Sequence, residues 1–499
     1  MRFEKGSENM KKTVMTLVVA LAGLAGATEY YVDDKAGNDA ADGKSPASAW
    51  QSLQKVNAAK FAPGDRVMFR RGGLWRGALR PQSGEEGNRL LYTNYGTGPK
   101  PILQNSVDRS APTYWQSLGN GLWESRDAVY GRDAGILIFN DGEDCGIKRW
   151  GIGELKNPKD FWYDEDAKRI VIRLDRNPGE AFRSIEVALS GHIVNQGSCH
   201  DVTYDGFTVR YTGCHGFGGG STRNITIRNC DIYWIGGGLQ FWGDKKNRKG
   251  PVRFGNGIEF WGECHGNLVE RCRLWQIYDA ALTNQTRDSP LPEADVTYRD
   301  NVVWDSEYSF EYWNHEIKSS TSNILFEHNT CIDAGYGLGH LQRPNRNGTH
   351  LMFFENPAKT TNFVVRNNVF VRSKDHAVWM CDDWRAKPGV RDGLQMYGNL
   401  WFDEGRFYDL VHRGYWKLPI NPTKDATYES GPAEFAKYQS ETGLDRGSVW
   451  GLPQFENEAR RDYRLKAGSI GKNAAPDGTD LGARNMPGLD RDQSEMKNE

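Results

Sequence analysis

The sequence has no excess of either charge: among its 499 residues, 63 Lys and Arg are balanced by 65 Asp and Glu, a formal net charge of −2. Proteins that bind nucleic acid usually present a basic surface, so this balance argues against a nucleic-acid partner. Long apolar runs are also scarce. The best candidate, residues 13–24, is too short for a bilayer, and no stable membrane span is expected.

Cysteine and serine motifs are missing as well. The chain has eight Cys but no Cys-x-x-Cys pair, which argues against a structural zinc site and a small disulfide scaffold. We expect buried thiols that pack as small apolar groups. A Gly-x-Ser-x-Gly turn, the usual context of a serine nucleophile, is also absent. We therefore expect no cofactor.

The N-terminus has the pattern of an export signal. Met10-Lys11-Lys12 is basic, residues 13–24 are mostly apolar, and Ala25-Gly26-Ala27 offers small residues for cleavage. We interpret residues 1–28 as a signal peptide that directs the protein to the periplasm or outside the cell, with Met10 as an alternative start. A single anchor helix is the competing interpretation. At the other end, residues 486–499 are predicted to be a disordered, charged tail.

A repeated strand is the most informative feature that is present. Five similar phrases recur at intervals of roughly 20–40 residues, the range typical of stacked units that cannot bury their apolar faces alone. They are 202–206, 225–229, 296–300, 324–328 and 363–367. The 57 Gly suit many turns, and the 17 Trp, 21 Tyr and 21 Phe could fill a core or stack on sugars.

Aligning the repeats places an asparagine column next to a hydrophobic one. Ile227 aligns with Tyr204, Val269, Tyr298, Phe326 and Val365. Three positions later stand Phe207, Cys230, Cys272, Asn301, Asn329, Asn368 and Asn399. Stacked Asn side chains can bond along a ladder and satisfy the backbone at a sharp bend. The pattern predicts parallel strands about 4.8 Å apart.

Three features of the sequence resemble those of secreted proteins in the pectate-lyase-like superfamily. They are the ladder, the start at 30–33 with Ala49-Trp50, and the end at 462–466 with 480–483. The resemblance implies an all-β fold, a right-handed parallel β-helix with an N-terminal helical cap. We assign residues 29–111 to the cap and first coils, 112–190 to a β-rich insertion, 191–402 to the core, and 403–485 to the C-terminal coils and cap. A looser similarity extends to glycoside hydrolase family 141.

The fold hosts glycoside hydrolases, polysaccharide lyases, esterases and non-catalytic adhesins, so the reaction must be argued from residues. After the Asn bend, each coil should contain a second strand. Alternation predicts that Leu239, Ala281, Phe310, Leu338 and Ala377 point inward. It places Gln240, Leu282, Glu311, Gly339 and Val378 on the outer face, where the resembling families commonly bind substrate.

Two acids meet on this predicted face. The turn column is predicted to hold Gly237, Asp279, Tyr308, Tyr336 and Asp375, and Glu311 lies three positions further in the next coil. Glycoside hydrolysis needs two carboxyl groups, one protonated and one ionised. We predict Glu311 as acid/base and Asp279 as nucleophile or base, with exchangeable roles. The competing interpretation is that Asp279 caps a turn and Glu311 pairs with a loop cation.

Other side chains complete the predicted site. Glu259 and His340 are additional catalytic candidates. Glu259 lies in a segment whose sequence resembles that of residues 238–243. The predicted substrate-binding residues are Gln240, Trp242, Tyr308, Trp313, Tyr336, Arg343, Lys374, His376 and Trp379. The neighbouring loops contain Lys245, Lys246, Arg248, Lys249, Arg287, Arg343 and Arg346, which would suit an acidic or sulfated glycan or would simply be solvated.

Two alternatives remain open. A lyase acting on a uronate would need a base and a cation, which Lys374, His376, His340 and Arg343 could supply. Ca²⁺ would enter only under this alternative, although no compact Asp cluster is evident. The Asp pattern of polygalacturonase-like enzymes is also missing, which argues against pectin. The second alternative is a β-helix that binds glycans without cleaving them. The protein is expected to be a monomer.

Overall fold

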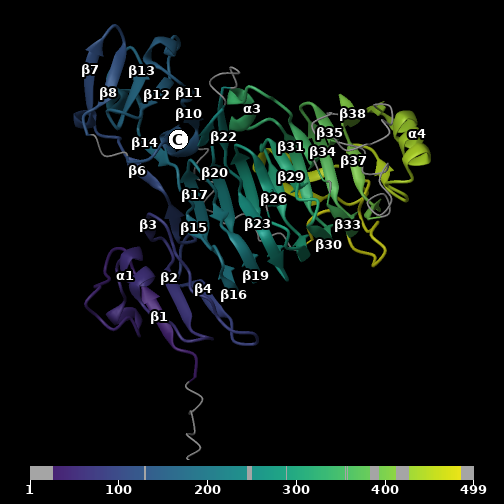
Figure 1. Cartoon of the computed structure of the whole chain (residues 1–499), viewed down its shortest axis with the longest axis horizontal. Coiled ribbons are helices and arrows are strands. Elements are labelled where there is room, and N and C mark those ends of the chain that lie inside the picture. Colours follow the sequence, from purple (N-terminus) through teal and green to yellow (C-terminus); the bar gives the residue numbers. More distant parts are fainter. Residues whose placement is uncertain are drawn as a thin grey trace, which may run out of the picture.

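The computed structural model describes residues 26–127, 131–243, 250–287, 289–354, 356, 358–381, 393–411 and 426–484. The predicted signal peptide and charged tail therefore lie almost entirely outside the described residues. Figure 1 shows a long stack of strands, with the N-terminal coils and a separate lobe at the same end. Within the described ranges, no helix is long and apolar enough to cross a membrane.

Each coil of the stack supplies three strands, which form three rows. The first row contains β16 (His200–Asp205), β19 (Gly220–Arg228), β24 (Leu268–Glu270), β27 (Glu293–Arg299), β30 (Ser320–Glu327), β33 (Lys359–Arg366) and β36 (Leu394–Tyr397). The second contains β17 (Thr208–Thr212), β20 (Asp231–Ile235), β25 (Arg273–Ile277), β28 (Val302–Trp304), β31 (Thr330–Ala334), β34 (Val369–Ser373) and β37 (Leu400–Phe402). The third contains β18 (Phe217–Gly218), β23 (Ile258–His265), β26 (Ala280–Thr286), β29 (Tyr308–Asn314), β32 (Thr349–Phe353), β35 (His376–Cys381) and β38 (Arg406–Val411). Neighbouring strands within these rows pair in parallel, which confirms the predicted parallel β-helix.

The asparagine ladder is confirmed. Nδ2 of Asn301 donates to Oδ1 of Asn329 at 3.0 Å, and the same bond continues from Asn329 to Asn368 at 3.2 Å and from Asn368 to Asn399 at 3.0 Å. The backbone N–H of each donor residue also bonds the next side chain. The ladder ends where Asn399 donates to Asp445 at 3.0 Å. These buried amides therefore satisfy the backbone at the bend between the first two rows.

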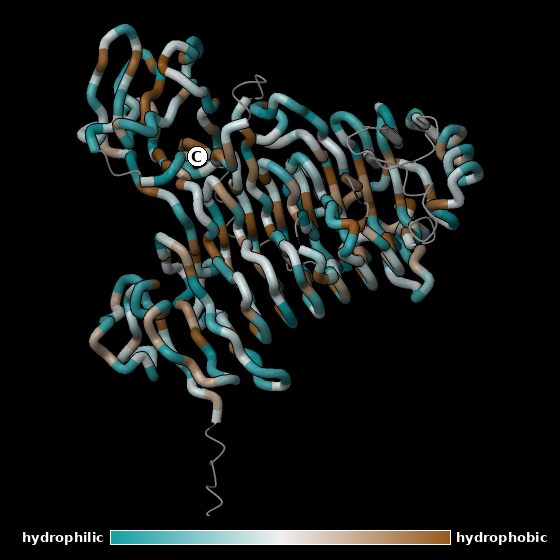
Figure 2. Tube along the Cα trace, in the orientation of Figure 1, coloured by the Kyte–Doolittle hydropathy of each residue, from teal (hydrophilic) through white to brown (hydrophobic). Residues whose placement is uncertain are grey.

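The predicted register of the first row is also confirmed. Tyr204, Ile227, Val269, Tyr298, Phe326 and Val365 are paired in successive strands, and all are buried. Apolar segments alternate with polar ones along the strands of the stack (Figure 2). The described cysteines pack into the fold as buried free thiols, as expected. The interior is thus a column of stacked apolar side chains, the core that a single coil could not provide.

The predicted alternation of the third row holds for Phe310, Ala281 and Ala377, which lie in the core, but is wrong at Leu282 and Val378. Leu282 pairs with Phe310, which pairs with Leu351 and then with Val378, and all four are buried in the core. Leu282 and Val378 therefore point inward rather than outward. The turns that precede these strands differ in length, so an alignment counted from the turns slips by one residue, and a slip of one exchanges the two faces.

Two segments expected as third-row strands lie elsewhere. Leu239 and Gln240 belong to β21 (Gly238–Trp242), which forms an antiparallel hairpin with β22 (Pro251–Phe254). Leu338, Gly339 and His340 belong to a short helix, α3 (Leu338–Gln342). The third-row strands of those coils are β23 and β32. Both segments are insertions that stand beside the row.

Both ends of the stack are covered. At the N-terminal end, β3 (Leu74–Arg76) and β5 (Ile102–Gln104) extend the second row, whereas β1 (Glu29–Val32), β2 (Arg66–Arg70) and β4 (Leu90–Tyr95) extend the first. There α1 (Leu53–Ala58) buries Leu53 and Val56, and Ser52 caps its first turn. At the other end, α4 (Pro432–Thr442) buries Phe435 and Tyr438. Short elements complete this end: β39 (Ala426–Glu429), β40 (Val449–Trp450), β41 (Phe455–Asn457) and β42 (Asp462–Leu465).

The lobe beside the first coils has its own hydrophobic core. One sheet contains β6 (Ser106–Asp108), β9 (Ala134–Phe139), β10 (Asp144–Cys145) and β14 (Ile185–Leu189). The other contains β7 (Trp115–Gly119), β8 (Leu122–Ser125), β11 (Ile147–Arg149), β12 (Asp160–Asp164) and β13 (Arg169–Arg173). The lobe contacts the third row's insertions, because Gln342 at the end of α3 accepts a hydrogen bond from Lys148 N at 3.2 Å.

Glu293 is a buried acid inside the stack, and it should make stability depend on pH. Burial raises its pKa well above the ordinary 4.5, and a contact with Thr321 opposes this only in part. The folded protein therefore holds a proton here that the unfolded chain releases, so this site loses stability as pH rises above 4.5 toward the folded pKa. We expect Glu293→Gln to raise the free energy of unfolding by about 1–3 kcal/mol at pH 8.

The same variant should differ little from the parent at pH 4, where the carboxyl group is protonated in both states. Urea unfolding of the two proteins at both pH values provides the measurement. An equal gain at both values would contradict the ionisation argument.

Candidate active site

A cavity of about 530 Å³ opens on the outer face of the third row. Strands β23, β26 and β29 form its floor, hairpin β21–β22 and the segment after α3 line it on other sides, and Met352 and Phe354 extend it. Its lining combines acids, amides, arginines and aromatic rings, including Glu259, Asp279, Glu311, Asn256, Gln285, Arg253, Arg343, Phe254, Trp261, Tyr308 and Trp313. Such a mixture of flat apolar walls and a few polar groups is typical of a small-molecule site.

Three carboxyl groups line this cavity. Glu259 pairs in register with Thr283, and Thr283 pairs with Glu311, so the two glutamates occupy one column two strands apart. Asp279 precedes β26 at the end of the same face. The register places Ala280 opposite Tyr308, so Asp279 lies one residue away from its predicted column. The cavity nevertheless brings Asp279 and Glu311 together, as the sequence predicted.

Glu311 is a buried acid whose surroundings disfavour its charged form. Its carboxyl group is almost wholly buried, and Gln285 Nε2 donates to Oε2 at 2.6 Å. Burial raises the pKa of Glu311 well above the ordinary value, and the neighbouring Asp279 raises it further. A carboxylic acid that is neutral near pH 7 can donate a proton to a leaving group.

Asp279 is bound to a cation. Arg343 Nη1 donates to Oδ1 of Asp279 at 2.7 Å and to the carbonyl oxygen of Tyr278 at 3.2 Å. The guanidinium carbon of Arg343 lies 5.3 Å from the ring centroid of Tyr278 and 5.2 Å from that of Tyr308. The predicted substrate-binding residue Arg343 therefore acts on Asp279, and its charge is already partnered. Asp279 in turn raises the pKa of Glu311 and of Glu259.

Glu259 is the third acid. Asn256 Nδ2 donates to its Oε2 at 2.7 Å, and His215 Nε2 lies 3.4 Å from its Oε1. Burial raises the pKa of Glu259 to about 7, although the bond from Asn256 opposes the shift. This carboxyl group therefore changes its charge near neutral pH.

The structure divides the other predicted substrate-binding residues. Gln240, Tyr308, Trp313 and Arg343 line the cavity. Trp379 is only 4% exposed, stacks on Phe354 and packs with the buried cluster that includes Met352, so its prediction as a sugar-stacking surface is wrong. Trp242 lies on the hairpin beside Trp150, at 5.4 Å between ring centroids, and does not line the cavity.

The predicted residues around α3 form a separate group. Nδ1 of His340 faces Glu307 at 3.4 Å and Asp375 at 3.7 Å, and Lys374 Nζ lies 5.0 Å from the centroid of the exposed Tyr336 ring. Like them, the half-buried His376 is absent from the cavity lining. His340 was placed in the site because its segment was interpreted as a strand, whereas it belongs to a helix.

Several lining residues escaped the sequence analysis. Trp261 follows Glu259 by two positions and lies 6.0 Å from Trp313 between ring centroids, with Gln285 between them in register. Residues 257–262 have nearly the same sequence as residues 238–243, and this similarity indicated a strand. Alternation along that strand places Glu259 and Trp261 on one face. His215 and Asn256 had no comparable signal, because they come from turns.

We expected a basic cleft, but the two described arginines that line it are already bonded to other groups of the protein. Arg343 is paired with Asp279, and Arg253 is buried and bound to the carbonyl oxygens of Gly237 and Gly135 and to Gln342. Lys245, Lys246, Arg248 and Lys249 lie outside the described residues. The described part of the cavity is therefore dominated by its three carboxyl groups.

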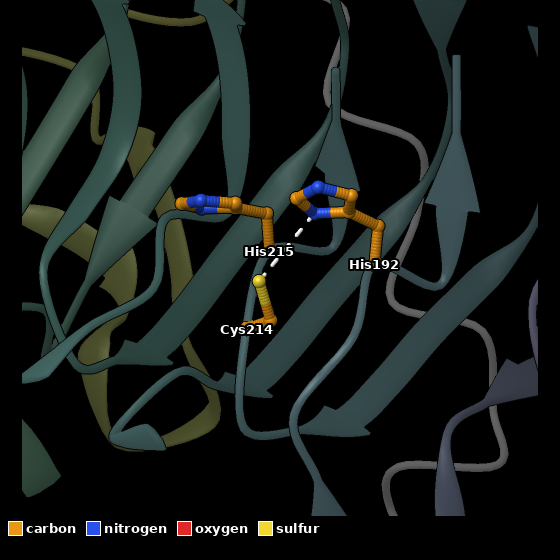
Figure 3. A group of neighbouring side chains, drawn as sticks. All are labelled: His192, Cys214 and His215. Carbon is orange, nitrogen blue, oxygen red and sulfur yellow. Dashed lines mark hydrogen bonds between the residues drawn. The ribbon is translucent and has the colours of Figure 1, made fainter. Parts of the chain in front are cut away.

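One group of side chains carries donor atoms of the metal-binding type. His192, Cys214 and His215 lie at the edge of the cavity floor, and their ligand atoms are within 4.8 Å of one another (Figure 3). Cys214 Sγ is 3.5 Å from His192 Nδ1. No other group of this kind occurs among the residues that the structure describes.

No family model and no curated protein sequence matches the chain. Solved structures with a related architecture include one described as a glycoside hydrolase, with 10% identity, a TM-score of 0.47 and coverage of 88% of this chain and 99% of that one. The pectate lyase Pel9A has 14% identity, a TM-score of 0.42 and coverage of 92% and 97%. A lacto-N-biosidase from Eubacterium ramulus has 13% identity, a TM-score of 0.34 and coverage of 76% and 64%. Likenesses this distant identify neither a family nor an activity.

Proposed function

We propose that the protein is an exported glycoside hydrolase that uses Glu311 as the general acid and Asp279 as the nucleophile or base. One observation carries the proposal: a buried acid, Glu311, whose pKa is raised, and an arginine-bound carboxyl group, Asp279, line one aromatic-walled cavity. Their different surroundings separate their charges, which is what two-carboxylate hydrolysis requires.

In the proposed reaction, a sugar ring binds against the Trp261 and Trp313 wall. Glu311 donates its proton to the glycosidic oxygen while the bond to the anomeric carbon breaks. Asp279 stabilises the positive charge that develops on the sugar, and it either attacks the anomeric carbon or removes a proton from the attacking water. Arg343 holds Asp279 in place through a charge-assisted hydrogen bond.

The lyase alternative has less support. Its proposed base and cation, Lys374, His376 and His340, are not in the cavity, and Arg343 is engaged by Asp279. Elimination from a uronate would leave an unsaturated product, which makes the two reactions easy to distinguish.

Digestion of a panel of polysaccharides and aryl glycosides would test the proposal. We expect new reducing ends without the ultraviolet absorbance of an unsaturated sugar. An unsaturated product would replace hydrolysis with elimination. Binding to a glycan array without any cleavage would favour the non-catalytic alternative and overturn the proposal.

The anomeric form of the first product, followed by NMR during the digestion, would distinguish a nucleophilic Asp279 from a basic one. Retention of configuration is expected for the nucleophile, and inversion for the base.

A further inference from the structure

Glu259 is held by a compact network of turn residues. Asn256 is buried, and its side chain has a fixed orientation because Oδ1 accepts a hydrogen bond from Ala280 N at 3.0 Å. Nδ2 is therefore directed at Oε2 of Glu259, at 2.7 Å. The backbone N–H of Asn256 donates to Nδ1 of His215 at 2.8 Å. One residue thus positions both the carboxyl group and the imidazole beside it.

This last bond determines which nitrogen of His215 carries the proton. Nδ1 accepts a hydrogen bond, so its lone pair is occupied and the neutral ring carries its proton on Nε2. Nε2 lies 3.4 Å from Oε1 of Glu259. Hydrogen bonds of this length in an unliganded site commonly shorten when the substrate binds. Burial lowers the pKa of His215 to about 4, so the ring stays neutral at physiological pH.

The same bond argues against a metal ion in the group of His192, Cys214 and His215. A histidine that binds a metal normally donates through its second nitrogen, whereas Nδ1 of His215 accepts. Nε2 would then have to lose its proton to become a ligand.

We infer that Asn256 and His215 are positioning residues for Glu259, and that the group of His192, Cys214 and His215 supports this carboxyl group without a metal. The inference rests on the proposed function in one respect, since it makes Glu259 a third carboxyl group that contacts the bound sugar. The charged and titratable groups that interact with Glu259 are His192, Cys214, His215, Asp279 and Glu311.

Glu259 lies two strands from Glu311, a backbone separation of about 9–10 Å. At this separation Glu259 can reach a sugar next to the one that Glu311 protonates. Glu259 therefore contacts a sugar beyond the one that is cleaved, or its hydroxyl groups, and accepts its hydrogen bonds.

The decisive variant is Asn256→Asp, which keeps the acceptor for Ala280 and removes the donor to Glu259. Loss of that donor and the new carboxyl group beside Glu259 both disfavour its charged form, so the titration midpoint of the Glu259 carboxyl group should move to higher pH. Carbon-13 NMR of glutamate-labelled protein, assigned with Glu259→Gln, measures this without any substrate. An unchanged midpoint would overturn the inference.

Asn267→Asp provides a matched control. Asn267 is also buried, its Oδ1 accepts from Ile225 N at 2.9 Å, and its Nδ2 donates to Thr222 at 3.0 Å, but it does not line the cavity. The Asn267→Asp variant should leave the titration midpoint of Glu259 unchanged. An equal shift in both variants would indicate general loosening and would also overturn the inference.

Two further measurements concern the histidine. Nitrogen-15 NMR should show His215 protonated on Nε2 and not on Nδ1; the opposite tautomer would contradict the positioning role. After incubation with Zn²⁺ and desalting, elemental analysis should find no equimolar zinc. Retention of one equivalent that is lost in His192→Asn would replace the support with a metal site.

On the glycan that the panel identifies, Asn256→Asp should raise KM about 10-fold or more with a smaller change in kcat, because Glu259 acts on binding. An unchanged KM would remove the role in sugar contact. If no glycan is cleaved at all, the proposed function fails, but the NMR titration still decides whether Asn256 and His215 position Glu259.

Discussion

Glu311→Gln should lower kcat/KM about 10²- to 10⁴-fold on the glycan that the wild-type protein cleaves best, with the loss mainly in kcat. The amide keeps the shape of the side chain and can still meet Gln285, but it cannot transfer a proton. An aryl glycoside with an acidic leaving group needs less protonation, so the loss on that substrate should be much smaller.

Asp279→Asn belongs to the same test. It removes the charge that stabilises the transition state, and the loss should be similar for good and poor leaving groups. Glu327→Gln is a suitable control, because Glu327 is paired with Arg366 on the first row, outside the cavity lining. Full activity in both Glu311→Gln and Asp279→Asn would refute the proposed site.

The pH dependence of the wild-type enzyme provides a second test of Glu311 as the general acid. An acid with a raised pKa remains active until the pH exceeds that pKa, so burial of Glu311 should place the alkaline limb of kcat/KM above the range of an ordinary glutamate. Glu311→Gln should abolish this limb.

Asn329→Leu should be strongly destabilising, by about 3–5 kcal/mol. Asn329 is fully buried, donates to Tyr298 O and to Asn368, and accepts from both the backbone and the side chain of Asn301. Leucine has a similar size but leaves these partners in the core without bonds. Chemical denaturation would give the loss directly.

Asn195→Leu is the control for that measurement. Asn195 is exposed on β15 (Val194–Asn195), so the same substitution should change stability by less than about 0.5 kcal/mol. Equal stability of the two variants would show that the ladder contributes little.

The ladder and the first row were predictable because each coil repeats them at constant spacing. Asn301 and Asn329 occupy the same bend of successive coils, so an alignment finds them whatever the sequence between them. The third row was harder, since the residues between the bend and the strand vary in number. Phe310 and Glu311 were assigned to the correct faces, whereas Leu282 and Val378 were assigned to the wrong side.

The candidate site was predictable where acids lie on regular strands, as with Glu311. It was not predictable where turns supply the contacts. Two segments with nearly the same letters, 238–243 and 257–262, adopt different roles, one in a hairpin and one in the stack. A single sequence does not indicate which of them will pair with β26, because both have the same alternation and only tertiary packing distinguishes them.

The carboxyl groups of the cavity come from successive turns of one stack, and this makes their spacing discrete. Side chains in a column can stand one, two or three strand spacings apart, in steps of about 4.8 Å, but not at intermediate distances. Gain or loss of a whole coil would therefore change the separation of Glu259 and Glu311 by one step and leave each strand's local fold intact. In such an architecture, the length of sugar held between two acids can change in evolution through the gain or loss of whole coils, while the surroundings of each acid stay the same.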